Sequence, residues 1–530
     1  MRKLGERHVE DLSREPPPPR PAGVRATLQV LGTVLGLALL PYLAPPLAGF
    51  RAWVPGDPLP FGGLLRLVGL EAPAVAAATH SEAGYRPETD SQLLLLPAVE
   101  PPMSTPPATA GSGQATAPPA GPASPLPPAS PPSAGQVPAP VSPAELEGIT
   151  QRVEHPPGGG LHTFHQQLAA ASLGHPGALA RLLVYGASTL GNDGITSALR
   201  HRLQRRFGDG GKGFVPIAPA WPTQSHQDVR WERTGDPWLA QAVTHRGRSD
   251  GRYGLAGVIA TSQGHSRATF GTLEEGPLGR SLARFELWYQ EWPRGGEVEV
   301  LVDGGSPRRF STRADVVADR VFTLMLDEGP HQLQVHAALG RSLLYGAVLE
   351  TAGPGVVVDT AMLIGARANR LLNFDPAHWA GQIARRNPDL LVLLMGDNEI
   401  ESDTRPPIAE FQRQFEEVIG RLRAGRPEAS CLILSATDHG VRVRGKIVTA
   451  PAVKETVTAQ RAAAFAQGCS FFDLYAAMGG EGSMGRWFQA TPRLGWGDLV
   501  HFTGKGSEVL GALIYKALLA DYAAWLEQGR

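Results

Sequence analysis

The sequence predicts an α/β fold with a doubly wound parallel sheet, into which an antiparallel β-sandwich is inserted. Two observations predict it. Beyond about residue 160, apolar runs alternate with stretches whose apolar residues recur at helical spacing, as in βα units. Between about 225 and 352 the pattern changes to short runs rich in Val, Leu, Phe, Trp and Tyr, separated by Gly and Pro turns, which is typical of antiparallel strands.

The first 155 residues are expected to precede this folded part. Residues 1–26 are basic, and residues 27–50 form an apolar stretch of nearly bilayer length, so we predict a transmembrane signal anchor or a signal peptide. The positive charges before it keep the N-terminus in the cytoplasm and send the rest outward. Residues 51–155, rich in Pro, Ala and Ser, are expected to be a mostly disordered linker. The predicted location is the cell envelope, periplasmic or extracytoplasmic, anchored in the inner membrane or secreted if the signal is cleaved.

The α/β domain is expected in two parts, residues 156–224 and 353–530, on either side of the insertion at 225–352. In the first part, an apolar strand over 181–185 leads into a helix on which Ile195, Leu199, Leu203 and Phe207 share one face. In the second part, strands are predicted over 355–364, 389–395, 431–435 and 470–474, and helices over 377–386, 408–423, 452–466 and 506–526.

Strands of the insertion are predicted over 284–289, 297–303, 332–337 and 343–349. Three aromatic residues, Trp288, Tyr289 and Trp292, leave two interpretations open. They are core side chains, as aromatic residues in strands usually are, or they form a surface on which sugar rings stack.

The residues that carry chemistry follow the ends of predicted strands. Ser188 stands in Gly186-Ala187-Ser188 after the first strand, and Asp498-Leu499-Val500-His501 stands before the last helix. A serine hydroxyl becomes a nucleophile when an imidazole takes its proton, and a carboxylate orients that imidazole. Gly365 and Asn398 follow two further strands, where their N–H groups, with that of Ser188, are placed to stabilise an oxyanion.

These four blocks, in this order, resemble the SGNH/GDSL hydrolases. The inserted β-sandwich and the sequence Gly396-Asp397-Asn398-Glu399 resemble the peptidoglycan O-acetylesterase-type members of bacterial cell envelopes, in which the inserted domain is similar to a carbohydrate-binding module. One position departs from the family pattern, because Ala187 stands where the first block usually has Asp.

The resemblance implies a catalytic triad of Ser188, Asp498 and His501 and an oxyanion hole formed by Ser188, Gly365 and Asn398, with no metal and no cofactor. The function that it implies is a serine acetylesterase that removes O-acetyl groups from a cell-envelope glycan, most simply peptidoglycan. Two alternatives stay open: a glycan O-acetyltransferase that uses the same triad, and a non-catalytic wall-binding protein. The net charge of −1 gives no reason to expect a nucleic acid as partner.

Cys431 and Cys469 are the only two cysteines. They flank consecutive strands of the predicted sheet, so a disulfide would form if both strands are adjacent and in register. The sequence also allows two buried thiols that never meet.

Overall fold

The computed structural model describes residues 138–245, 247–400 and 405–528, which belong to one compact unit. The predicted anchor at 27–50 and the linker up to residue 137 lie outside these residues. The last part of the predicted linker is ordered. Ser142 caps a short 3-10 helix, η2 (Pro143–Leu146), and Glu154 exchanges two backbone hydrogen bonds of 2.8 Å with Phe471 at the edge of the central sheet.

The central sheet confirms the predicted α/β class with a parallel sheet. Its five parallel strands lie in the order β13-β1-β14-β15-β18. The first strand of the chain has neighbours on both sides, as in a doubly wound sheet. The strand bounds are β1 (Leu179–Gly186), β13 (Gly355–Met362), β14 (Leu390–Leu394), β15 (Ser430–Leu434) and β18 (Ser470–Phe472).

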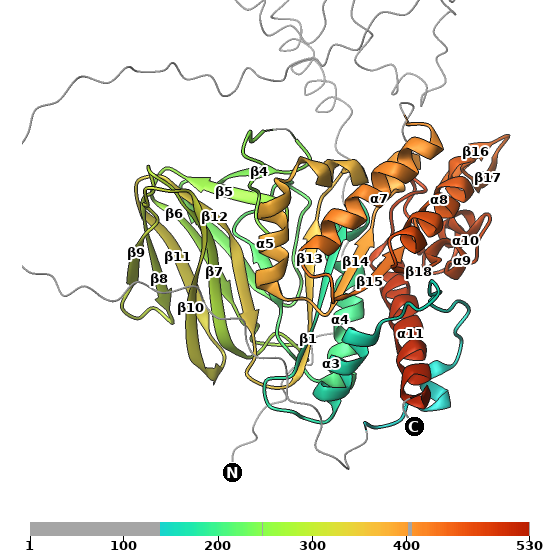
Figure 1. Ribbon diagram of the computed structural model, residues 1–530, viewed down its shortest axis with the longest axis horizontal. Helices are drawn as coiled ribbons and strands as arrows, with labels where there is room; N and C mark the ends of the chain where they lie inside the picture. Colours follow the sequence, from blue (N-terminus) through green and yellow to red (C-terminus); the bar gives the residue numbers. More distant parts are fainter. Residues whose placement is uncertain (1–137, 246, 401–404, 529–530) are drawn as a thin grey trace, which may run out of the picture. The chain divides into compact units, whose positions relative to one another are not determined.

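Helices cover both faces of this sheet, which explains why its strands are apolar on both sides (Figure 1). Alternate residues of β1 point to opposite faces. Leu182 packs in an apolar cluster with one helix group, and Leu183 in a cluster with the other. The first group is α3 (His162–Ser172), α4 (Gly194–Phe207) and α11 (Gly504–Gln528); the second is α5 (Pro376–Arg386), α7 (Ile408–Ala424) and α8 (Ala452–Ala466).

Among the described residues, α11 is the one helix that is long and apolar enough to cross a membrane. Its Leu510, Ile514 and Leu518 are buried in the same apolar cluster as α4, so the structure uses this helix to cover the sheet. The predicted membrane segment lies at the other end of the chain, outside the described residues.

Between α4 and β13 the chain forms two antiparallel sheets whose apolar residues share one cluster. The first has the order β10-β7-β12-β5-β4, with β2 paired to β12, and the second the order β3-β6-β11-β8-β9. The four strands predicted here are present as β7, β8, β11 and β12. The bounds are β2 (Gly213–Pro216), β3 (Arg230–Gly235), β4 (Leu239–Ala242), β5 (Val258–Ser262), β6 (Ser266–Gly271), β7 (Leu282–Glu291), β8 (Glu297–Val302), β9 (Arg308–Ser311), β10 (Ala318–Gly329), β11 (Gln332–Leu339) and β12 (Ser342–Glu350).

The interpretation that Trp288 and Tyr289 form a sugar-stacking surface is wrong. Trp288 and Tyr289 are 1% and 7% exposed. Trp288 packs edge-to-face on Phe214, and its indole N–H donates to Glu286. Burial of these rings leaves them no face for a ligand. Trp292 is half-buried, with the guanidinium groups of arginines over its ring.

The two cysteines form a disulfide, Cys431–Cys469, with a Cα–Cα distance of 4.8 Å. The parallel register explains it. Leu432 of β15 pairs with Ser470 of β18, so the cysteines that precede them lie at the same level of adjacent strands.

Several short elements were not predicted from the sequence. A hairpin, β16 (Gly440–Val443) and β17 (Lys446–Thr449), projects beyond the central sheet near α10 (Figure 1). The other short elements are η3 (Ser188–Leu190), η4 (Ala368–Asn373), α6 (Asp397–Ile400), α9 (Leu474–Ala477) and α10 (Ser483–Gln489).

Candidate active site

Three neighbouring strands end at the same level of the sheet. Gly186 at the end of β1 pairs with Met362 of β13 on one side and with Leu394 of β14 on the other. Ser188, Gly365 and Asn398 follow these residues by two, three and four positions. The carboxyl ends of parallel strands are where ligands bind in open α/β sheets, and here three predicted site residues emerge together.

Gly186 allows the chain to turn sharply into η3. A Cβ atom on it would lie 2.5 Å from the Leu190 side chain and 2.9 Å from the carbonyl oxygen of Leu394. Ala187, which follows, is fully buried in the apolar cluster on that face. Ala187, at the position where the family pattern usually has Asp, therefore lies in an apolar environment. Ser188 is the first side chain of the turn to reach solvent.

The structure joins Ser188, His501 and Asp498 in one chain of hydrogen bonds. Ser188 Oγ lies 2.9 Å from His501 Nε2, and His501 Nδ1 lies 2.9 Å from Asp498 Oδ2. Ser188 and His501 are 313 positions apart in the sequence. They meet because α11 begins beside α4, directly after the Asp498–His501 turn. This is the geometry that a serine nucleophile, its base and an orienting carboxylate require.

The turn that carries the acid and the base is held by its own backbone. Asp498 Oδ1 accepts from the N–H groups of Val500 and His501, both at 3.0 Å. Burial tends to raise the pKa of Asp498, but these bonds and that to the His501 ring outweigh it and lower the pKa. Leu499 adopts a left-handed φ of 64°, which costs a non-glycine residue about 1–2 kcal/mol, and its buried side chain and a hydrogen bond from Gly440 N–H hold it there.

A hydrogen bond ties the two further predicted oxyanion donors together. Asn398 Nδ2 donates to the carbonyl oxygen of Ala366 at 2.9 Å, next to Gly365. Gly365 has φ +72°, is exposed, and has open space where a Cβ would be. The second amide N–H of Asn398 has no acceptor among the described residues. Both positions thus keep an N–H donor near the end of the sheet from which Ser188 emerges.

A buried carboxylate that the sequence did not single out connects the Ser188 turn to the Asn398 segment. Asp397, 3% exposed, accepts from Thr189 Oγ1 at 2.8 Å, from Thr437 N–H at 3.0 Å, and faces His439 Nε2 at 3.0 Å. Burial alone would raise the pKa of Asp397, and these bonds lower it. The sequence does not single out Asp397 as a site residue, because an Asp beside Asn398 is also typical of a tight turn. Only the fold brings Thr189 and His439 to it.

Glu399, the last residue of the same block, is buried on the other side of Asn398. Its Oε1 accepts from Ala368 N–H at 2.7 Å, at the start of η4. Burial raises the pKa of Glu399 to about 7, even though that bond and Arg367 act in the opposite direction. Glu399 therefore fixes the segment after Gly365 to the segment that carries Asn398.

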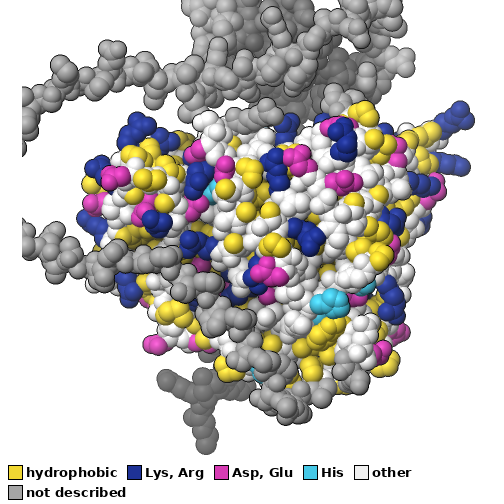
Figure 2. Space-filling view, in the orientation of Figure 1, with side chains coloured by type: hydrophobic (Ala, Val, Ile, Leu, Met, Phe, Trp, Pro, Cys, Tyr) yellow, Lys and Arg dark blue, Asp and Glu magenta, His cyan; other side chains and the backbone are white. Residues whose placement is uncertain are grey.

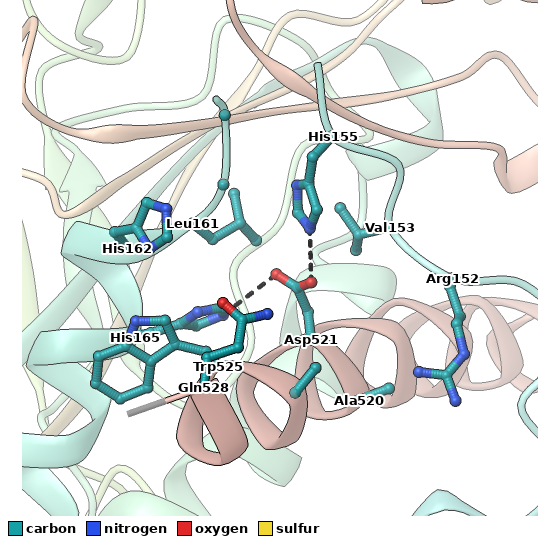
Figure 3. A pocket seen from close by; sticks show the side chains of 13 residues that line it. Arg152, Val153, His155, Leu161, His162, His165, Ala520, Asp521, Trp525 and Gln528 are labelled. Carbon is teal, nitrogen blue, oxygen red and sulfur yellow. Dashed lines mark hydrogen bonds and ion pairs between the residues drawn. The ribbon is translucent and has the colours of Figure 1, made fainter. Parts of the chain in front are cut away.

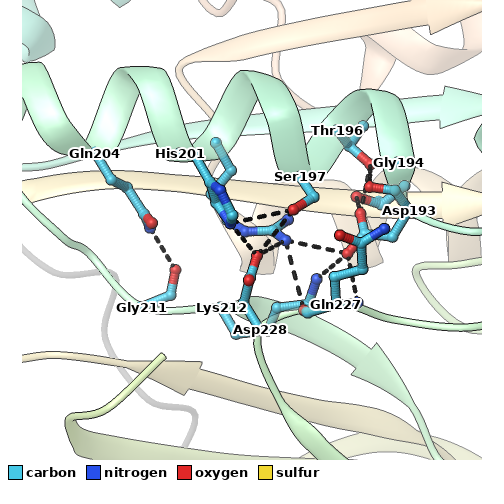
Figure 4. A network of polar contacts seen from close by, with 12 residues as sticks. Asp193, Gly194, Thr196, Ser197, His201, Gln204, Gly211, Lys212, Gln227 and Asp228 are labelled. Atoms are coloured by element: carbon cyan, nitrogen blue, oxygen red, sulfur yellow. Dashed lines mark hydrogen bonds and ion pairs between the residues drawn. The ribbon is translucent and has the colours of Figure 1, made fainter. Parts of the chain in front are cut away.

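A network of buried charges fixes the start of α4, directly after the Ser188 turn (Figure 4). Asp193, fully buried with a left-handed φ of 56°, accepts from Arg200 at 3.1 Å, Lys212 at 2.5 Å and the N–H of Gln227 at 3.0 Å. Burial opposes ionisation of Asp193, but the two cations hold its pKa far below the usual range. Burial and Arg200 lower the pKa of Lys212 to about 8. The network anchors η3 because Asp193 N–H also donates to Leu190.

A separate cavity of about 260 Å³ lies at the other end of α11 (Figure 3). It is lined among others by Asp521 and Trp525 of α11 and by His155 and His165; His155 Nε2 lies 2.7 Å from Asp521 Oδ1. Asp521 stands 17 residues after Gly504, about 25 Å along the helix axis, so this cavity is not part of the Ser188 site. Within 138–245, 247–400 and 405–528, no group of three His, Cys, Asp or Glu residues is placed to hold a metal ion.

Known proteins are similar to the chain in sequence pattern and in fold. Residues 334–509 match the GDSL-like Lipase/Acylhydrolase family; the match includes Gly365, Asn398, Asp498 and His501, while Ser188 precedes it. No curated protein matches the chain. A solved structure of a peptidoglycan O-acetylesterase is similar over 69% of this chain and 98% of its own, with a TM-score of 0.59 and 23% identity, which shows the shared fold.

Two further solved structures are similar over smaller parts or less closely. They are a lipase/acylhydrolase from Enterococcus faecalis (22% identity, TM-score 0.24, 31% of this chain and 77% of its own) and a family two carbohydrate esterase from Cellvibrio japonicus (12%, 0.23, 56% and 99%). The family match alone shows that the chain carries a GDSL-like lipase/acylhydrolase domain at 334–509, the domain of a carboxylic ester hydrolase.

Proposed function

We propose that the chain is a serine acetylesterase that removes O-acetyl groups from a cell-envelope glycan, peptidoglycan being the substrate that we favour. The observation that carries this proposal is the unbroken hydrogen-bond chain from Ser188 Oγ through His501 to Asp498. The fold shared with a peptidoglycan O-acetylesterase supports the choice of substrate.

In this mechanism Ser188 Oγ attacks the ester carbonyl carbon while His501 Nε2 takes its proton. Asp498 stabilises the imidazolium that forms. The negative charge on the carbonyl oxygen is stabilised by the N–H groups of Ser188 and Gly365 and by the second amide N–H of Asn398, which has no acceptor in the described part of the chain. His501 then returns the proton to the departing sugar oxygen, which leaves an acetyl-serine. His501 then takes a proton from water, whose oxygen attacks this ester, and returns the proton to Ser188 Oγ as acetate leaves, which restores the free enzyme.

The same proposal assigns the domains. The esterase domain comprises 156–224 and 353–530, and a β-sandwich is inserted at 225–352. One strand of the first antiparallel sheet, β2, comes from the esterase part and pairs with β12 of the insertion. The chain leaves the α/β part after α4 and returns to its sheet with β13, which supports an insertion. The N-terminal residues 27–50 are proposed to anchor the enzyme in the inner membrane, or to direct its secretion, so that it acts outside the cytoplasm.

Acetate release tests this function. Wild-type protein should release acetate from O-acetylated peptidoglycan, and Ser188→Ala should release none while keeping its folded circular dichroism spectrum. Including a deacetylated glycan as acceptor separates hydrolysis from acetyl transfer: consumption of an acetyl ester that depends on the acceptor, with no free acetate, would instead indicate an O-acetyltransferase. Wild-type protein that is inactive on every acetyl ester would contradict the proposal.

A further inference from the structure

The β16–β17 hairpin, residues 440–449, is attached directly to the turn that carries Asp498 and His501. Gly440 N–H donates to the carbonyl oxygen of Leu499 at 2.8 Å, and Ala450 N–H closes the base by donating to His439 at 2.7 Å. Ile447 packs against Gly485, where a Cβ would lie 3.2 Å from it. The base of the hairpin is therefore fixed to the catalytic turn, and the rest projects from the domain (Figure 1).

The projecting part of the hairpin is cationic. Arg442, Arg444 and Lys446 are exposed, and the hairpin contains no acidic residue. None of the three has an ion-pair partner among the described residues. The exposed carboxylate of Glu481 is paired with Lys454 at 2.8 Å. Figure 2 shows Lys and Arg side chains at this projecting end. Three exposed, unneutralised cations on one short hairpin create a local positive potential that attracts anions.

Two aromatic rings, the half-buried Phe488 and the exposed Trp496, continue this surface toward the catalytic histidine. Arg442 lies over the Phe488 ring at 5.6 Å from its centroid, and Arg493 over the same ring at 4.7 Å. Gly497 lies close to the same ring, because a Cβ atom on it would be 4.0 Å from Phe488 Cε2. Trp496, which precedes Gly497, is 57% exposed. Its backbone N–H donates to the carbonyl oxygen of His501 at 2.8 Å. We call the set of Arg442, Arg444, Lys446, Phe488, Arg493 and Trp496 the basic strip.

We propose that the basic strip binds a carboxylate-bearing glycan polymer and positions its acetylated sugar at Ser188. The proposal rests on the proposed esterase function and specifies its substrate as an anionic polymer. Guanidinium groups bind carboxylates through paired N–H donors, and those of Arg442 and Arg493 are pre-positioned by Phe488. The exposed indole of Trp496 offers a flat apolar face for a sugar ring beside His501. A small neutral acetyl ester has no carboxylate for the hairpin to bind, so it serves as the reference substrate.

The test compares two triple variants of equal charge change. Arg442→Gln/Arg444→Gln/Lys446→Gln neutralises the hairpin, and Arg267→Gln/Arg308→Gln/Arg313→Gln neutralises three exposed arginines of the antiparallel sheets. For each, kcat/KM is measured on O-acetylated peptidoglycan, on acetylated xylan without carboxylates, and on a small acetyl ester. In the hairpin variant at low salt, the ratio for peptidoglycan over small ester should fall at least tenfold. Raised salt should lower the same ratio in wild type, and the matched control should keep it.

Trp496→Ala should lower the ratio for both polymers, because contact of its ring with a sugar does not depend on charge. Equal ratios in wild type and hairpin variant, or an equal loss on peptidoglycan and xylan in that variant, would overturn the proposal. A wild type without activity on peptidoglycan would count against the proposed function instead. In that event, affinity electrophoresis in polygalacturonate and in dextran, each compared with a gel without polymer, still tests the strip. Retardation by polygalacturonate alone, lost in the hairpin variant, supports it, and equal retardation of variant and wild type refutes it.

Discussion

The raised pKa of Glu399 makes the stability of the site depend on pH. Glu399 is 3% exposed, and burial raises its pKa from the ordinary 4.5 to about 7. A carboxyl that holds its proton more tightly when folded makes the folded state less stable as pH rises from about 4.5 to about 7. At about 1.4 kcal/mol per pH unit, the loss amounts to about 3 kcal/mol when ionisation is complete. Glu399→Gln removes this titration and keeps an oxygen acceptor for the Ala368 N–H.

Urea unfolding of wild type and Glu399→Gln at several pH values measures this effect. The difference in unfolding free energy, variant minus wild type, should grow by about 2–3 kcal/mol between pH 5 and pH 8. Other groups that titrate in this range cancel in the difference. Glu417→Gln removes a half-exposed carboxylate on α7 and controls for the loss of one negative charge. A Glu399→Gln difference that stays constant with pH would refute the assignment of this titration to Glu399.

Three further predictions follow from the site and its supports. Asn398→Ala should lower kcat by about a hundredfold or more with little change in KM, because its amide acts on charge that develops in the transition state; a change in KM alone would make it a substrate-binding residue. The protein unfolded without reductant should titrate no free thiol, and replacing Cys431 and Cys469 by serine should lower the unfolding free energy by up to about 4 kcal/mol, since the bridge spans 38 residues. Asp193→Ala should lower the unfolding free energy at pH 7 by about 3 kcal/mol or more, measured by urea unfolding, because it leaves the ammonium of Lys212 buried without its carboxylate; a loss under about 1 kcal/mol would contradict this.

The sheet and the positions of the predicted site residues could be predicted because their signals are local. Each strand is largely apolar, and Ser188, Gly365 and Asn398 follow strand ends within four positions. The disulfide could not be decided from the sequence. It depends on the register between β15 and β18, a pairing of strands distant in sequence that leaves no mark on either cysteine.

The supports of the site could not be predicted because their partners are remote in sequence. Asp397 contacts Thr189, 208 positions earlier, and His439, 42 positions later. The hairpin at 440–449 was missed because its strands are only four residues long, too short for the alternation of Val441 and Val443 with arginines to identify a strand. The aromatic pair of β7 gave an ambiguous signal, since burial and sugar binding favour the same residue types.

Labelling with a fluorophosphonate tests the central claim, an activated Ser188, most directly. This reagent forms a stable phosphonyl ester with a serine whose hydroxyl is activated by a neighbouring base. Intact-mass analysis of wild type should show one adduct, and peptide mapping should place it on Ser188. Ser188→Ala should gain none, and His501→Ala should react far more slowly because the base at 2.9 Å from Ser188 Oγ is gone. An adduct on another serine, or an unchanged labelling rate in Ser188→Ala, would contradict the account.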